Sequence, residues 1–154
     1  MAECRARRPL FLIDAMTESP PLADIKVMVI DDSATVRASA ALFLSQAGAQ
    51  VVLAEDGFTA LAKLHDEQPA VVFCDILMPR LDGYQTCALI KQNPHFAATP
   101  VIMLSSKDGL FDQARGQLAG SDDYLTKPFT GDNLIEATLR FARRLASPDA
   151  DDNS

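Results

Sequence analysis

Three aspartates, a serine and a lysine stand directly after short apolar runs in this sequence. They are Asp31 and Asp32 after residues 27–30, Asp75 after residues 70–74, Ser105 after residues 101–104, and Lys127 after residues 124–126. If these runs are neighbouring parallel strands, their carboxyl ends meet at one edge of a sheet, where ligands of such folds bind. Three close carboxylates repel one another and attract a cation. An all-oxygen ligand set suits Mg²⁺ or Mn²⁺ better than zinc.

The same residue types suit phosphoryl transfer. A carboxylate beside a divalent cation can attack phosphorus and form an acyl phosphate. The transferred group then needs positive charge and hydrogen-bond donors, which the Lys127 ammonium and the Ser105 hydroxyl can supply. The metal ligands that we expect are the side chains of Asp32 and Asp75, the backbone carbonyl of Leu77 and, through water, Asp31. Each of these residues alone would be interpreted as an ordinary helix cap or a solvated side chain. The prediction rests on their occurring together at the ends of strands of one sheet.

Strand-like and helix-like segments alternate between residues 25 and 145. The predicted strands are 27–30, 51–54, 70–74, 101–104 and 124–126. The predicted helices are 33–47, 58–64, 84–91, a weak one at 113–119, and 134–145. This alternation predicts right-handed βαβ units. We therefore expect an α/β fold with a doubly wound, five-stranded parallel sheet of order 2-1-3-4-5, flanked by five helices.

Composition restricts the function classes. The chain has 154 residues, enough for one domain, and a net charge of −7 from 14 basic and 21 acidic residues. An acidic balance argues against nucleic acid or an anionic membrane as the main partner. No apolar run approaches the ~20 residues of a membrane span. The three cysteines (Cys4, Cys74 and Cys87) form no C-x-x-C pair, which is typical of a reducing, cytoplasmic compartment.

The two ends of the chain differ from the middle. We expect a flexible N-terminal extension over residues 1–24, in which translation starts at Met1 or at Met16. Residues 25–146 form the predicted domain. Residues 147–154 are an acidic tail with no apolar side chain larger than alanine, so burial there cannot offset the entropy of ordering.

Five segments resemble the receiver domain of two-component response regulators. They are residues 29–33 (VIDDS), 75–79 (DILMP), 81–83 (LDG), 100–105 (PVIMLS) and 124–129 (YLTKPF). The resemblance implies a flavodoxin-like fold in which Asp75 accepts a phosphoryl group from a histidine kinase. It also implies that Asp31 and Asp32 hold Mg²⁺, that Lys127 contacts the phosphoryl group, and that Ser105 and Tyr124 are switch residues.

The resemblance extends to a sub-family. Residues 79–86 and 104–112 are similar to regulators of type IV pilus twitching motility. This implies a stand-alone, chemotaxis-type regulator with a CheA-like kinase and no DNA-binding effector. Its downstream protein target would bind the face made by the helix at 113–119, the strand at 124–126 and the last helix. The chain would be a phosphoacceptor with at most slow self-dephosphorylation, not an enzyme. Leu77 is a departure, because many relatives carry a polar residue there.

Other function classes remain open at this point. An aspartyl-phosphate phosphatase-type enzyme shares this chemistry but usually carries D-x-D after the first strand, where this chain has Asp31-Asp32-Ser33. A flavin-binding module needs a phosphate-cradling loop where these two anions stand. A phosphate sink within a phosphorelay would keep the same site residues but have no downstream target, and a phosphorylation-independent adaptor would lack some of them.

Overall fold

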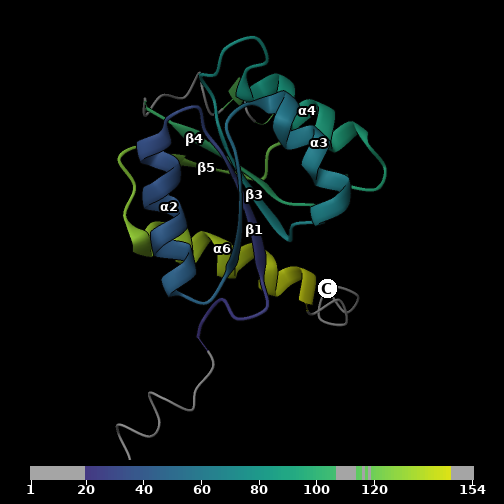
Figure 1. Cartoon of the computed structure of the whole chain (residues 1–154). Helices are drawn as coiled ribbons and strands as arrows, with labels where there is room; N and C mark the ends of the chain where they lie inside the picture. Colours follow the sequence, from purple (N-terminus) through teal and green to yellow (C-terminus); the bar gives the residue numbers. More distant parts are fainter. Residues whose placement is uncertain (1–19, 107–113, 116, 118, 147–154) are drawn as a thin grey trace, which may run out of the picture.

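The computed structural model describes residues 20–106, 114, 115, 117 and 119–146. The strands are β1 (Lys26–Ile30), β2 (Gln50–Ala54), β3 (Val71–Asp75), β4 (Val101–Ser105) and β5 (Asp123–Thr126). The helices with defined bounds are α2 (Ala34–Gln46), α3 (Gly57–Glu67), α4 (Gly83–Gln92) and α6 (Gly131–Ala146). All strand pairs are parallel, and their order is β2-β1-β3-β4-β5 (Figure 1). The predicted sheet and its strand order are therefore confirmed.

Helices cover both faces of this sheet. In Figure 1, α2 and α6 lie together on one side of the sheet, and α3 and α4 on the other. Every residue of β3 and β4 is buried, which explains why these strands read as continuous apolar runs and not as alternating ones. Two apolar cores follow, one beneath each pair of helices.

Strand register brings the predicted site residues to one edge. Ile30 pairs with Cys74, so the residues after them, Asp31 and Asp75, end adjacent strands. On the next strand, Asp75 pairs with Leu104, the residue before Ser105. The polar residues at the carboxyl ends of β1, β3 and β4 therefore lie side by side.

Side-chain caps fix where the helices begin at this edge. Ser33 accepts a hydrogen bond from the Val36 amide and caps α2, and Asp56 does the same for α3 through the Thr59 amide. At α4, Asp82 and Gln85 form a reciprocal capping box. The helix starts lie next to the strand ends, so these caps also hold the rim of the site.

The segment before β1 packs on the domain. The Leu22 side chain is fully buried, and its amide donates to the Ala47 carbonyl at the end of α2 over 2.8 Å. The sequence analysis assigned Leu22 to the N-terminal extension, because one leucine after two prolines has no periodicity. The core thus gains a side chain from before residue 25.

Two details of the helices differ from the sequence pattern. Phe58 has helical spacing with Leu61 and Leu64, but it is 53% exposed at the start of α3. Five helices were expected and four have defined bounds. Of the predicted helix at 113–119, only residues 114, 115, 117 and 119 are described, and these are helical. The other residues of that prediction lie outside the described part of the chain.

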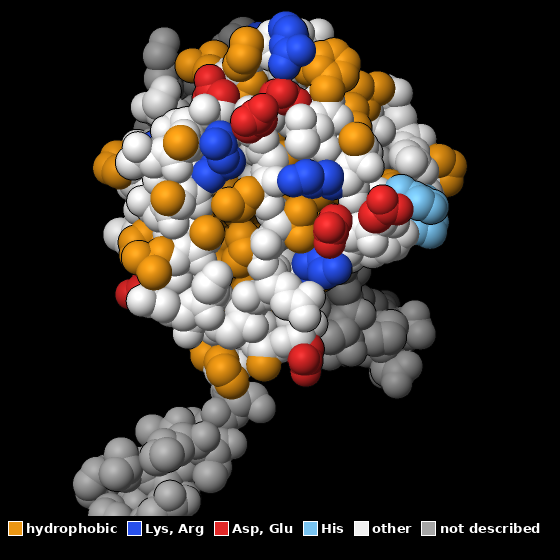
Figure 2. Space-filling view, viewed as in Figure 1, with side chains coloured by type: hydrophobic (Ala, Val, Ile, Leu, Met, Phe, Trp, Pro, Cys, Tyr) orange, Lys and Arg blue, Asp and Glu red, His pale blue; other side chains and the backbone are white. Residues whose placement is uncertain are grey.

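The remaining sequence features behave as ordinary packing or surface residues. Cys74 and Cys87 are buried in the core, and Cys4 lies outside the described residues. His65 and His95 are exposed neighbours at one edge of the molecule (Figure 2). Within the described ranges, no helix has both the length and the apolar character that crossing a bilayer requires.

Candidate functional site

An acidic cluster lies at the carboxyl edge of the sheet. Carboxylate oxygens of Asp31, Asp32 and Asp75 all lie within 4.8 Å of one another. Asp31 is fully buried and Asp75 is 5% exposed, whereas Asp32 faces solvent. The structure therefore brings together the three carboxylates that the sequence pattern predicted as neighbours. Because two of them are withdrawn from water, their mutual repulsion is only weakly screened.

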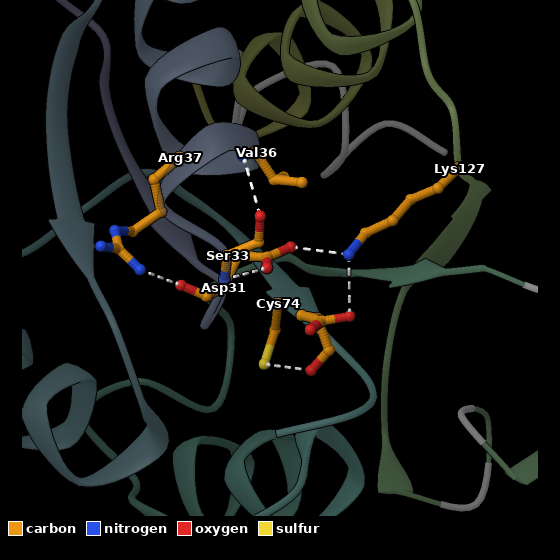
Figure 3. Close-up of polar contacts among 7 residues, drawn as sticks. Asp31, Ser33, Val36, Arg37, Cys74 and Lys127 are labelled. Atoms are coloured by element: carbon orange, nitrogen blue, oxygen red, sulfur yellow. Dashed lines mark hydrogen bonds and ion pairs between the residues drawn. The ribbon is translucent and has the colours of Figure 1, made fainter. Parts of the chain in front are cut away.

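Lys127 spans the two buried carboxylates. Its ammonium nitrogen Nζ lies 2.8 Å from Asp31 Oδ2 and 3.1 Å from Asp75 Oδ1. Figure 3 shows the side chain extending from the end of β5 across to Asp31. The Lys127 amide donates to the Ser105 carbonyl over 2.6 Å, and this hydrogen bond fixes the backbone of Lys127 against β4. The Lys127–Pro128 peptide bond is cis.

Asp31 is held in place by the start of α2. Its Oδ1 accepts from the Ser33 amide at 2.9 Å, so both of its carboxylate oxygens already have donors. Its carbonyl accepts from the Arg37 guanidinium at 2.6 Å (Figure 3). The sequence analysis did not predict Arg37, because one arginine on a helix has no spacing that separates it from a solvated side chain. Asp31 is therefore the most firmly fixed carboxylate of the cluster.

Burial and charge shift the protonation equilibria of the site. Burial, followed by the nearby negative charge of Asp31, raises the pKa of Asp75 from 3.8 to about 6, although Lys127 opposes the shift. For Lys127, burial alone would lower the pKa, but the hydrogen bonds to Asp31 and Asp75 outweigh it and the net pKa is raised. The lysine therefore stays charged, while Asp75 is ionised at neutral pH at an energetic cost that a cation would relieve.

The donor set fits a hard divalent cation. All three clustered side chains offer oxygen, and the described residues include no second group of three or more His, Cys, Asp or Glu with this geometry. Asp32 is open to solvent, and Lys127 partly neutralises the charge of Asp75. Leu77 is 66% exposed, so an apolar side chain faces solvent two residues after Asp75.

Ser105 and Tyr124 lie on the two strands that follow the strand of Asp75 in the sheet. Ser105 ends β4, is 3% exposed and pairs with Thr126 on β5. Tyr124, two residues before Thr126, is half-buried and pairs with Met103. Ser105 is thus on the strand next to Asp75, and Tyr124 is on the edge strand beyond it.

Gly83 allows α4 to start against the end of β3. A Cβ atom at this position would lie 2.1 Å from the Asp75 carbonyl oxygen and 2.7 Å from the Ile76 Cα. The Gly83 amide donates to the Ile76 carbonyl over 2.8 Å. Glycine is therefore required by this close approach, and the sequence pattern alone gave no physical reason for it.

The chain is similar to known proteins in sequence and in fold. The family model of the response regulator receiver domain matches residues 27–139. Protein PilG of Pseudomonas aeruginosa is 62% identical over 113 residues, which cover 73% of this chain and 84% of that protein. The solved structure of chemotaxis protein CheY4 of Vibrio cholerae has a TM-score of 0.74 and 29% identity, covering 77% of this chain and 99% of that one.

Longer regulators also match. The probable transcriptional regulator ycf27 of Guillardia theta is 40% identical over 124 residues, which cover 79% of this chain but only 48% of that protein. What these relatives share with the chain is thus the receiver portion. The chain belongs to the response regulator receiver domain family, and it is a receiver-domain response regulator similar to PilG.

Proposed function

We propose that Asp75 is the phosphoacceptor of this regulator and receives its phosphoryl group from a histidine kinase. The observation that carries the proposal is the Lys127 ammonium, which lies within 3.1 Å of a buried Asp75 carboxylate beside two further aspartates. A carboxylate nucleophile with a fixed cation at hydrogen-bond distance is the arrangement that acyl phosphate formation needs.

The transfer step uses residues of this chain. A carboxylate oxygen of Asp75 attacks phosphorus, and a P–O bond forms as the P–N bond to the donor's phosphohistidine breaks. The imidazole nitrogen keeps the bonding electron pair. Lys127 Nζ donates to the oxygens of the transferred group, and the Ser105 hydroxyl provides a further donor from β4. We infer that the chain is a phosphoacceptor with at most slow self-dephosphorylation, not an enzyme.

Asp32, Asp75 and the Leu77 carbonyl are the proposed ligands of a Mg²⁺ ion, or Mn²⁺ in its place. Asp31 already accepts from Lys127 and from the Ser33 amide, which supports its contact through water. When bound, the cation supplies positive charge against the negative charge of the phosphoryl group.

Phosphorylation is proposed to switch a protein-binding face formed by residues 113–119, β5 and α6. The modification adds about −1.5 to −2 charge and three acceptor oxygens at the rim. Ser105 can turn toward one of these oxygens, and Tyr124 on the neighbouring strand can then turn inward. β5 is the edge strand of the sheet, so such a change reaches the surface directly. The switch is a population shift between two states that bind phosphate unequally.

The proposed biological setting is chemotaxis-like control of type IV pilus motility in the cytoplasm, with a CheA-like kinase and no nucleic-acid or membrane partner. The similarity of residues 79–86 and 104–112 to twitching-motility regulators supports it, as does the 62% identity to PilG. We further propose that residues 25–146 are the receiver domain, and that residues 1–24 and 147–154 are its extension and tail. Leu22 is the residue of this extension that packs on the domain.

The test is incubation with acetyl phosphate and Mg²⁺ followed by intact mass measurement. The expected result is a gain of one phosphoryl group, lost with a chelator and in Asp75→Asn. Equal labelling of Asp75→Asn would contradict the assignment.

The switch is tested separately from phosphate acceptance. Ser105→Ala should still be labelled at Asp75, but it should not show the change in amide exchange at residues 105–106 and 119–124 that phosphorylation causes in the parent protein. If Ser105→Ala shows the same change in amide exchange as the parent protein, the Ser105 hydroxyl has no role in the switch. Labelling of the parent with no localised response would favour a phosphate sink.

A further inference from the structure

Arg80 has a backbone conformation that residues other than glycine rarely adopt. Its φ is +68°, and the Leu81 amide donates to the Pro79 carbonyl over 2.7 Å, which closes a three-residue turn around it. A turn of this kind with positive φ is strained, and such strain persists only where the surrounding contacts enforce it.

The Arg80 side chain supplies such contacts. Its guanidinium nitrogen lies 3.0 Å from Asp56 Oδ2, and the guanidinium carbon lies 5.5 Å from the centre of the Phe58 ring. Asp56 is itself immobilised, because its other oxygen caps α3 through the Thr59 amide at 2.7 Å, and its side chain is only 12% exposed. The Phe58 ring is 53% exposed, and the Arg80 cation lies against it.

The residues joined in this way lie on two separate parts of the site rim. Asp56 and Phe58 start α3, whereas Arg80 belongs to the loop between β3 and α4, which also carries Leu77. The ends of that loop are fixed by backbone bonds, Ile76 amide to Leu104 carbonyl at 3.1 Å and Gly83 amide to Ile76 carbonyl at 2.8 Å. Between these ends, Arg80 ties the loop to α3.

We propose that Arg80 is a positioning residue for phosphoryl acceptance: its ion pair with Asp56 and its contact with the Phe58 ring hold the β3–α4 loop, and with it the Leu77 carbonyl, in the conformation that metal binding beside Asp75 needs. This inference rests on the proposed function of Asp75. Arg80 touches no reacting atom and acts only through the loop.

A purely structural ion pair would behave differently. An ordinary surface pair contributes little to global stability, and its loss leaves distant binding unchanged. If the Arg80 contacts position the loop, their loss should weaken metal binding while the fold remains intact, because β3 and α4 are anchored independently of the turn.

Arg80→Gly is the informative variant, since it removes the side-chain contacts and adopts positive φ without strain, while it also gives the backbone more freedom. Arg80→Lys keeps a side chain and therefore separates the two effects. The probe is Mg²⁺ alone, titrated against the full chain, together with the rate of labelling by acetyl phosphate and the urea unfolding midpoint. We expect the Mg²⁺ dissociation constant to rise about tenfold and labelling at limiting Mg²⁺ to slow in proportion, with little change in the midpoint. Arg80→Lys, which keeps the positive charge, should recover part of the affinity.

Two further variants sharpen the result. Arg140→Ala is the matched control, because Arg140 also pairs with an aspartate, Asp123, and also lies 5.5 Å from a phenylalanine ring, that of Phe141. It should leave Mg²⁺ affinity unchanged. Asp56→Asn keeps a capping side chain on α3 but removes the charge that faces Arg80, so its effect should be non-additive with that of Arg80→Gly.

Unchanged Mg²⁺ affinity in Arg80→Gly would overturn the inference, as would an equal loss in Arg140→Ala. If the parent protein binds Mg²⁺ but is never labelled, the proposed function of Asp75 fails, while the affinities still decide the role of Arg80.

Discussion

Replacing Asp75 by asparagine should make the metal-free protein more stable at neutral pH. Asp75 is 5% exposed, and its carboxylate lies within 4.8 Å of two others. Burial and repulsion from these charges therefore disfavour its ionised form. Asparagine has nearly the same shape and its carbonyl can still accept from Lys127. The substitution therefore removes repulsion without creating a cavity.

The size of the effect follows from the pKa of Asp75, which rises from 3.8 to about 6 on folding. One pKa unit corresponds to about 1.4 kcal/mol, so the charged form of Asp75 destabilises the folded state by at most about 3 kcal/mol. The neutral amide gives up part of the charge-assisted bond to Lys127. We therefore expect a gain of about 1–3 kcal/mol in the free energy of unfolding.

The pH dependence has a definite sign. Between the unfolded value of 3.8 and the folded value of about 6, the folded protein binds more protons at Asp75 than the unfolded chain does. Stability from this group is therefore lost as pH rises through that window. The difference in free energy of unfolding between Asp75→Asn and the parent should be near zero at pH 3.8. It should grow as the pH rises to about 6 and stay constant at higher pH.

Urea unfolding in the presence of a chelator, at a series of pH values across this window, measures the difference. Asp66→Asn, which removes an exposed carboxylate from α3, is the control and should change stability by less than about 0.5 kcal/mol throughout. Added Mg²⁺ should stabilise the parent more than Asp75→Asn and so reduce the gap. A destabilised Asp75→Asn at neutral pH, or a difference that does not vary with pH, would refute the reasoning.

Three other substitutions test separate parts of the site. Gly83→Ala should cost about 3 kcal/mol in urea unfolding, because its Cβ would lie 2.1 Å from the Asp75 carbonyl oxygen; unchanged stability would show that α4 shifts freely. Lys127→Met should destabilise the fold by about 2–3 kcal/mol and raise the pKa of Asp75 further, seen as slower acetyl phosphate labelling near neutral pH. Leu77→Ala should leave stability within about 0.5 kcal/mol but shorten the phosphoryl half-life measured by intact mass, since a smaller side chain admits water; an unchanged half-life would contradict this.

The fold was predictable where packing is periodic. Continuous apolar runs identified the buried strands, and the order β2-β1-β3-β4-β5 is that of a doubly wound sheet with right-handed crossovers. Leu22 was assigned outside the domain, and the helical spacing of Phe58 with Leu61 and Leu64 did not indicate that Phe58 is exposed. Leu22 is buried by a turn that returns to the end of α2, and Phe58 is exposed beside a cation from another loop. Both outcomes depend on contacts between segments that a local pattern does not contain.

The site was predictable where it depends on strand ends. The clustering of Asp31, Asp32 and Asp75 follows from parallel register, and that register is visible in the alternation of elements. The residues that hold the site residues in place were not predictable from strand ends. Arg37 binds a carbonyl six residues earlier and Arg80 binds Asp56 across the rim, so each depends on a side-chain direction that only the folded chain defines.

The most direct test of the central claim is to locate the phosphoryl group. After labelling with acetyl phosphate and Mg²⁺, borohydride reduces an aspartyl phosphate to homoserine, and peptide mass spectrometry then identifies the residue. The account predicts homoserine at position 75 alone, with none at Asp31 or Asp32 and none without Mg²⁺. Homoserine at either of those residues, or a phosphoryl group that resists borohydride, would contradict it.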